Sequence, residues 1–182
     1  MGSRFVVQTT PLAGLLVLQR QPAGDSRGLF ERLYCQEELA EHLAGRSIVQ
    51  INHSWSASRG TVRGLHFQHP PYAETKCVQC LHGEVFDVAV DLRRDSPTYL
   101  HWHAELLSAT NHKTLLIPEG FAHGFQTLSD GCRMLYFHTQ YYCPEAEGGM
   151  HVLDPRLAIR WPLPVTGLSA RDAGFAMLTA TA

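Results

Sequence analysis

The stretch GEVFDVAVDL, residues 83–92, gives the clearest strand signal in the sequence. Apolar and polar side chains alternate along it with the period of two that a strand has when it faces a core. Comparable runs cover Leu12 to Leu18, which predicts the first strand, and 48–55, 75–82, 99–107, 114–118 and 133–142. Turn signals such as Asp95-Ser96-Pro97 separate these runs. Many short strands with few helices predict an all-β, double-sheet fold, and we favour a jelly roll.

Two short segments have helical patterns. The segment from Gln36 to Ala44 has acidic residues in its first turn, two leucines four residues apart, and Gly45 placed to end it. Residues 169–172 have the form of a capping box that opens a second helix. The chain shows no internal repeat, low-complexity segment or linker. We therefore expect a single domain over residues 1–182, in which the segment from about 165 to 182 packs outside the barrel.

Charge and cysteine content limit the classes of partner and compartment. The formal net charge of -2 provides no basic field that would attract nucleic acid or an anionic membrane. The five cysteines are an odd number in strand-like surroundings, which favours a reducing compartment. Cys77 and Cys80 have the spacing of a metal or redox pair, but no second pair follows. The apolar run at Leu12 is too short to span a bilayer, so we expect a cytoplasmic protein.

Four residues suggest proton chemistry. His66, Lys76 and Asp87 lie on neighbouring predicted strands, and Tyr136 lies on a later one. Their apolar neighbours could line a dry cavity. Such a set offers a base near neutral pH, a cation for a developing oxyanion and a phenol that can act as an acid. Each residue taken singly is equally compatible with a structural role, as a hydrogen-bonded histidine or a packed tyrosine ring.

The eleven histidines raise a second alternative, a metal site. His101 and His103 have the spacing of two ligands on one strand, and His123 follows downstream. The missing acidic partner makes this the weaker interpretation. Arg27, Arg63 and Arg171 each lie near a glycine, a turn or a predicted helix start, where a guanidinium could bind a diphosphate, although solvated surface arginines are equally compatible with the pattern.

Seven motifs follow one another between about residues 12 and 173. They are DSRG (25–28), QINHS (50–54), RGLHFQ (63–68), GEVFDVAVD (83–91), IPEGFAHGF (117–125), EG (147–148) and LSARD (168–172). Motifs of this length in this order resemble the dTDP-4-dehydrorhamnose 3,5-epimerase family. The resemblance implies a cupin-type double-stranded β-helix with a few short peripheral helices. It also implies a homodimer without metal or organic cofactor that inverts C3 and C5 of a nucleotide-linked 4-keto-6-deoxy sugar.

The resemblance further implies roles for individual residues. His66 matches the base and Asp172 its paired carboxylate, although Asp172 could instead only close the capping box. Lys76 matches the lysine that stabilises the enolate, and Tyr136 matches the acid on the opposite face of the sugar. The residues that match contacts to the substrate or lie beside them are Arg27, Phe30, Gln50, Asn52, Arg63, Asp87, His123, Tyr141, Glu147 and Arg171. Of these, His123 and Asp87 match a second His–Asp pair.

Three departures from the family pattern leave alternatives open. Arg32 stands where a glutamate that contacts the base is usual, so either Glu31 reaches across or the base is recognised differently. Phe137 stands where a lysine is common, and the tail after Asp172 lacks a usual proline. The alternatives are an epimerase of one carbon or of another nucleotide sugar, a metal-dependent cupin enzyme, and a non-catalytic sugar-nucleotide binding module.

Overall fold

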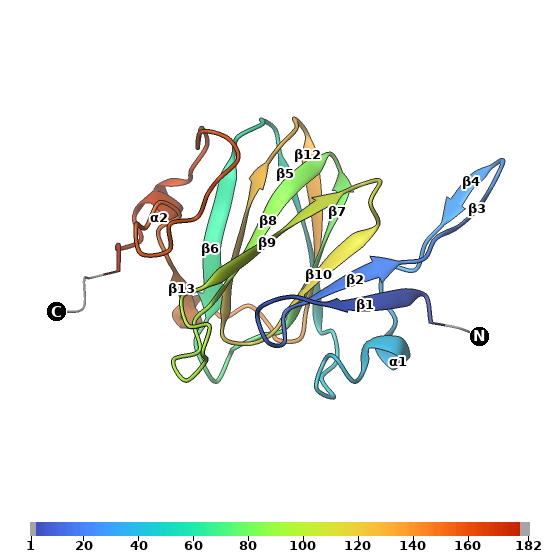
Figure 1. Cartoon of the computed structure of the whole chain (residues 1–182), viewed down its shortest axis with the longest axis horizontal. Helices are drawn as coiled ribbons and strands as arrows, with labels where there is room; N and C mark the ends of the chain where they lie inside the picture. The colour runs from blue at the N-terminus through green and yellow to red at the C-terminus, as the bar shows by residue number, and fades with distance from the viewer. Residues whose placement is uncertain (1–2, 179–182) are drawn as a thin grey trace.

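The computed structural model describes residues 3–178 of the chain (Figure 1). The strands within them are β1 (Phe5–Thr9), β2 (Leu16–Arg20), β3 (Ala23–Asp25), β4 (Gly28–Phe30), β5 (Gln50–Ser56), β6 (Val62–Gln68), β7 (Lys76–His82), β8 (Glu84–Asp91), β9 (Trp102–Ser108), β10 (Lys113–Ile117), β11 (Phe121–Thr127), β12 (Cys132–His138) and β13 (Glu147–Gly149). The helices are α1 (Gln36–Leu39), the 3-10 helix η1 (Pro144–Ala146) and α2 (Ala170–Ala173).

Two antiparallel sheets form the body of the molecule. One has six strands in the order β1-β2-β10-β7-β12-β5, and the other has five in the order β13-β6-β11-β8-β9. Buried residues from both sheets, among them Val78, Val85 and Met134, form the cluster between them. Burial of such side chains is the main favourable term for this layered arrangement. The predicted all-β, double-sheet fold is therefore confirmed.

The strand at residues 83–92 is buried on both faces rather than one. Val85 and Ala89 of β8 belong to the cluster between the sheets, whereas Val88 and Val90 belong to a second cluster with Met150. Since side chains alternate along a strand, the second cluster lies on the outer face of the five-stranded sheet. Asp87 has the same parity as Val85 and Ala89, so its side chain points into the space between the sheets.

The first predicted strand is displaced from its observed position, and the first predicted helix is longer than the observed one. The first strand of the described residues is β1, and the run expected at Leu12 becomes β2 only from Leu16. The helix expected from Gln36 to Ala44 has one turn and ends at Leu39. After Leu39 the amide of His42 already bonds three residues back, which is the tighter turn that often ends a helix.

Strand β11 was not among the predicted runs. All seven of its residues are buried, so its sequence FAHGFQT has no exposed face and shows no polar alternation. Gly64 of β6 and Gly124 of β11 allow these strands to approach closely, since a Cβ on Gly64 would lie 2.5 Å from the Cα of Gly124. Cα register then pairs His66 with His123 across the two strands.

Two peripheral segments differ in how they contact the body. The β3–β4 hairpin projects away from it at the upper right of Figure 1. Phe30, the last residue of β4, is 77% exposed. Val165, Leu168 and Leu178 pack against the outer cluster of the five-stranded sheet. The segment predicted to pack there extends to residues 179–182, which lie outside the described residues. Within residues 3–178, no helix is long and apolar enough to cross a membrane.

Candidate active site

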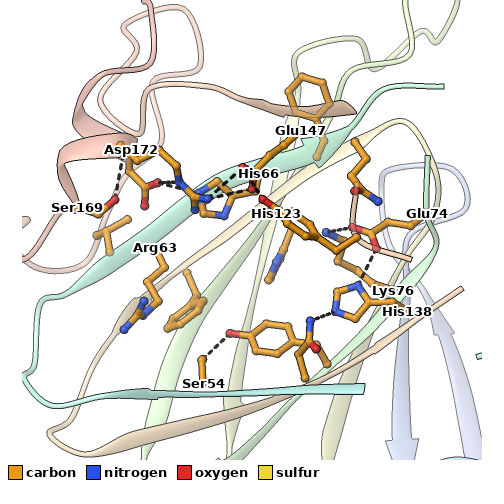
Figure 2. A pocket seen from close by; sticks show the side chains of 18 of the residues that line it. Ser54, Arg63, His66, Glu74, Lys76, His123, His138, Glu147, Ser169 and Asp172 are labelled. Atoms are coloured by element: carbon orange, nitrogen blue, oxygen red, sulfur yellow. Dashed lines mark hydrogen bonds and ion pairs between the residues drawn. The ribbon is translucent and has the colours of Figure 1, made fainter. Parts of the chain in front are cut away.

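A cavity of about 710 Å³ opens between the two sheets (Figure 2). The six-stranded sheet contributes Asn52, Ser54, Lys76, Tyr136 and His138 to its wall, and the five-stranded sheet contributes Arg63, His66, His123 and Glu147. Ser169, Arg171 and Asp172 from the α2 region complete the wall. The volume is in the range of small-molecule sites, and polar groups converge on it from both sheets.

His66 and Asp172 form a close pair at one side of the cavity (Figure 2). His66 Nε2 lies 2.8 Å from Asp172 Oδ1, and the Gly64 amide donates to Asp172 Oδ2 at 3.2 Å. Burial lowers the pKa of His66, and Asp172 offsets part of that effect. Burial by itself would raise the pKa of Asp172, but the contacts from His66 and Gly64 lower it below its ordinary value. The pair is therefore a neutral imidazole oriented by a carboxylate, which can accept a proton.

Residues 169–172 form one of the two hydrogen bonds of a capping box. The Asp172 amide donates to Ser169 Oγ at 3.0 Å, as in an N-cap. The Asp172 carboxylate accepts hydrogen bonds from His66 and Gly64 instead of returning to the start of its own helix. One residue thus supplies its backbone to the helix cap and its side chain to the histidine.

Arg171 and Glu147 border the same pair. Arg171 Nη1 lies 3.0 and 3.1 Å from the two carboxylate oxygens of Glu147, and Arg171 Nη2 lies 2.9 Å from His66 Nε2. Arg171 is half exposed, and its charge contributes to the lowered pKa of His66. A cation at this edge can meet an anionic group of a ligand.

Tyr136 lies on the opposite wall of the cavity from His66, because β12 belongs to the six-stranded sheet. Its hydroxyl is 2.8 Å from Ser54 Oγ on the neighbouring strand. Burial raises the pKa of Tyr136 far above its ordinary value, so the phenol keeps its proton at neutral pH. It is therefore a proton donor facing a proton acceptor across the cavity.

Lys76 is held by a residue that the sequence analysis did not identify. Glu74, just before β7, places Oε1 2.8 Å from Lys76 Nζ and accepts a hydrogen bond from His138 Nδ1 to Oε2 at 2.7 Å. Burial alone would raise the pKa of Glu74, but His138 and Lys76 lower it to about 2. The carboxylate thus remains ionised. Glu74 and His138 each lie two residues from a predicted site residue, on the same strand or beside it, but this spacing does not show that the two side chains meet.

Replacing Glu74 with glutamine is expected to lower the free energy of unfolding by about 2 kcal/mol at pH 7. Because the pKa of Glu74 is about 2 in the folded chain and ordinarily 4.5, its contribution is complete above pH 4.5 and is lost as the pH falls toward 2. Urea unfolding of both proteins between pH 7 and pH 3 measures this dependence. A difference that stays constant over that range would contradict the assignment.

His123 and Asp87 form a second pair deeper in the molecule. His123 Nε2 is 3.0 Å from both carboxylate oxygens of Asp87, and both side chains are buried. Burial raises the pKa of Asp87, and the interaction with His123 offsets part of that rise. His123 lines the cavity, whereas Asp87 lies behind it and fixes the imidazole.

Besides Asp87, four of the predicted substrate contacts do not line this cavity. Arg27 and Phe30 lie on the projecting hairpin around a separate hollow of about 390 Å³, where Arg27 pairs with Asp25. Gln50 accepts a hydrogen bond from the Tyr142 amide, and Tyr141 is largely exposed. The roles of these four residues in binding a substrate stay predictions.

The three departures in sequence have different structural outcomes. Glu31 is held by buried Arg20 and by His112, so its carboxylate is already engaged. Arg32 pairs with Glu38 instead of facing the cavity. Phe137 packs in a third cluster on the outer face of the six-stranded sheet, and in the tail Phe175 lies edge-on to His66 with ring centroids 6.0 Å apart.

The alternative metal ligands are not brought together. Within residues 3–178, no three or more histidine, cysteine, aspartate or glutamate side chains form a group that could hold a metal ion. His103 lies beside Glu105 and His123 beside Asp87, so the set with His101 does not converge.

Comparison with known proteins shows the family to which this chain belongs. The family model for dTDP-4-dehydrorhamnose 3,5-epimerase matches residues 9–180. The chain belongs to this epimerase family. It is 46% identical over 177 residues to the dTDP-4-dehydrorhamnose 3,5-epimerase of Salmonella typhimurium, covering 96% of both chains. Family membership confirms the predicted class of enzyme, an isomerase that acts as an epimerase.

Two solved structures of the family confirm the cupin-type jelly roll. The Bacillus anthracis dTDP-4-dehydrorhamnose 3,5-epimerase with TDP and PPi bound has a TM-score of 0.92 and 41% identity, covering 96% of this chain and 99% of that one. The Legionella pneumophila epimerase in complex with dTDP-4-keto-L-rhamnose has a TM-score of 0.90 and 39% identity, with 95% and 92% coverage. The first relative therefore binds TDP and PPi, and the second binds a dTDP-linked keto sugar.

Proposed function

We propose that this chain inverts C3 and C5 of a dTDP-linked 4-keto-6-deoxy sugar, converting dTDP-4-dehydro-6-deoxyglucose to dTDP-4-dehydrorhamnose. The observation that supports this most strongly is the pairing across the cavity of a neutral, carboxylate-oriented His66 with a protonated Tyr136. Inversion at carbon needs a base on one face and an acid on the other, and the two facing sheets supply them.

In the proposed reaction His66 removes the proton from the carbon next to the C4 ketone. The electron pair of the broken C–H bond moves to the ketone oxygen and forms an enolate. Such a C–H is less acidic than an imidazolium by roughly ten pK units, and each unit corresponds to about 1.4 kcal/mol. Lys76 therefore has to stabilise the enolate as it forms. Tyr136 protonates the carbon from the opposite face, and exchange with solvent returns His66 and Tyr136 to their starting states.

The proposal needs no metal or organic cofactor, because the ketone itself makes the adjacent proton removable. Arg63 and Arg171 at the cavity edge are the proposed partners of the diphosphate, and Arg63 is oriented by Ser56 Oγ at 2.9 Å. His123, fixed by Asp87, is the proposed second polar contact to the sugar. Glu147 and Asn52 are further proposed nucleotide contacts within the cavity.

Asp172→Asn is expected to lower the epimerisation rate about 10²-fold to 10³-fold, since an amide cannot stabilise the imidazolium that forms on His66. Asp172 raises the pKa of His66, so the acid limb of the pH profile should move to lower pH in the variant. Ser169→Ala is the matched control. It removes the helix cap at a cost of about 1 kcal/mol in stability and should leave the rate nearly unchanged. Equal losses in both variants would assign Asp172 to the cap alone.

We propose further that the protein is a homodimer in which the β3–β4 hairpin completes the site of the partner subunit. The hairpin projects from the body, its residues are exposed, and its predicted base and phosphate contacts lie away from the chain's own cavity. A single chain therefore leaves Arg27 and Phe30 without the ligand that the resemblance predicts for them.

Mixing two inactive variants is expected to restore activity if the hairpin acts on the partner. His66→Ala retains a normal hairpin, and Arg27→Ala/Phe30→Ala retains a normal cavity. After equal mixing and subunit exchange, half of the dimers are mixed and each has one complete site, so about one quarter of the wild-type activity should return. Absence of any recovery, with mixed dimers verified by mass, would show that the hairpin does not act in this way.

A cytoplasmic location and a single domain over residues 1–182 are also part of the proposal. All five cysteines are free thiols, which suits a reducing compartment.

Product analysis tests the proposed substrate. Purified protein is incubated with dTDP-4-keto-6-deoxyglucose and, separately, with the UDP-linked and CDP-linked sugars, and the ring configurations are followed by NMR. We expect the dTDP-linked rhamno product. Inversion only with another nucleotide, or at one carbon only, would contradict the proposal in substrate or in outcome.

A further inference from the structure

The cavity wall contains a buried carboxylate that the proposed reaction does not use. Glu74 is only 9% exposed at its side chain and lines the cavity. Each of its two carboxylate oxygens contacts a different side chain of the same wall, Oε1 with Lys76 and Oε2 with His138. A buried carboxylate with two charge-assisted contacts is held in a fixed orientation.

His138 extends this contact toward the proposed acid. Its ring stacks on that of Tyr136, with centroids 6.2 Å apart and an interplanar angle of 24°. The two residues are two positions apart on β12 and so point to the same face of the sheet. The other ring nitrogen, Nε2, lies 3.4 Å from Asn52 Nδ2. A continuous series of contacts therefore links Lys76, Glu74, His138 and Tyr136 along one wall; Figure 2 shows its first three members in contact.

The buried Lys76 ammonium in this series needs a negative group close to it. Lys76 has a side-chain exposure of 8%, and an ammonium at that burial is costly unless a negative group accompanies it. Asp87 also acts on Lys76 electrostatically, but Asp87 is bonded through both oxygens to His123. Glu74 is the carboxylate in direct contact with the ammonium. Because it bonds only one of the three ammonium protons, the remaining donors are available to a ligand oxygen.

We propose that Glu74 is a positioning residue for the epimerisation: it holds the Lys76 ammonium where the enolate oxygen forms and, through His138, fixes the ring of Tyr136. This inference rests on the proposed function, in which Lys76 and Tyr136 act on the substrate. Glu74 itself is assigned no reacting group. Loss of the carboxylate should therefore affect turnover more than binding. Misplacement of catalytic groups by about 1 Å typically costs on the order of 10²-fold in rate.

The test compares Glu74→Gln, Glu74→Asp and Glu74→Ala with wild type. Glutamine keeps the size and most hydrogen-bonding capacity of the side chain but removes its charge, whereas aspartate keeps the charge and shortens the reach. We expect Glu74→Gln to lower kcat about 10-fold to 100-fold, with KM and dTDP affinity changed less than about threefold. Glu74→Asp should retain more activity than Glu74→Gln. A wild-type kcat in Glu74→Gln would overturn the proposal.

Chemical rescue separates positioning from a merely structural role. The alanine variant leaves a space in which formate can restore a carboxylate, so added formate should raise its kcat in a saturable manner while neutral formamide should not. Equal rescue by both compounds, or no rescue by formate, would overturn the proposal. Glu41→Gln, at an exposed site outside the cavity, is the control and should behave as wild type with and without formate.

Two further measurements keep the test decisive. His138→Ala removes the link to Tyr136, whereas His138→Asn keeps an amide donor near the position of Nδ1, so the asparagine variant should retain more turnover than the alanine variant.

If Glu74→Ala does not fold in a thermal scan, the glutamine and aspartate comparison decides the question. Isotope exchange by wild type is measured first. Its absence would refute the proposed function, whereas normal exchange by both wild type and Glu74→Gln would refute only the role of Glu74.

Discussion

His66→Ala is expected to reduce deuterium uptake from heavy water at both C3 and C5 by on the order of 10³-fold. The imidazole is the group in the cavity whose lowered pKa and carboxylate partner prepare it to accept a proton. The alanine variant should still bind dTDP, since the proposed diphosphate partners Arg63 and Arg171 remain. Uptake is read at each ring carbon by mass spectrometry and NMR.

His101→Ala is the matched control for that variant. His101 is exposed, does not line the cavity, and belongs to the alternative metal-ligand set of the sequence analysis. Its removal should leave exchange unchanged. Loss of activity in His101→Ala, with normal exchange in His66→Ala, would reverse the assignment and restore the metal-dependent interpretation.

Tyr136→Phe is expected to separate exchange from inversion. Without the phenol, the enolate can still form and regain a deuteron from His66 on the original face, because His66 is partly exposed and its proton can exchange with solvent. Inversion should fall about 10²-fold to 10³-fold, while uptake with retained configuration continues. The ratio of labelled starting sugar to inverted product is the quantity to measure.

Ser54→Ala provides the comparison for the tyrosine variant. It removes the hydrogen bond at 2.8 Å to the Tyr136 hydroxyl but keeps the proton donor. Its loss of activity should be no more than about tenfold. Inversion at both carbons by Tyr136→Phe at the wild-type rate would show that another group protonates the opposite face.

The fold class and the His66–Asp172 pair were predicted from two different kinds of sequence signal. Strand alternation is a local property, so residues 83–92 indicated a strand directly. The pair joins residues 106 positions apart, and only the family motifs connected them. Strand β11 was missed because both of its faces are buried and its sequence carries no alternation. The predicted helix was too long because two buried leucines fit equally well in a tight turn.

The parts of the site that could not be predicted depend on strand neighbours. Glu74 belongs to none of the seven motifs, and it became a candidate only when pairing of β7 with β12 set Lys76 opposite His138. Conversely, Arg27 belongs to a motif but lies on a hairpin outside the cavity of its own chain. Sequence spacing gives the face of each strand, whereas the order of strands in a sheet is a long-range property of the whole fold.

The measurement that tests double epimerisation most directly is incubation of the wild-type protein with dTDP-4-keto-6-deoxyglucose in deuterium oxide, with label followed at each ring carbon over time. We predict deuterium at both C3 and C5, with inverted configuration at both carbons in the product. Label at one carbon only, or at neither, would contradict the proposal that this cavity inverts both centres of a thymidine-linked sugar.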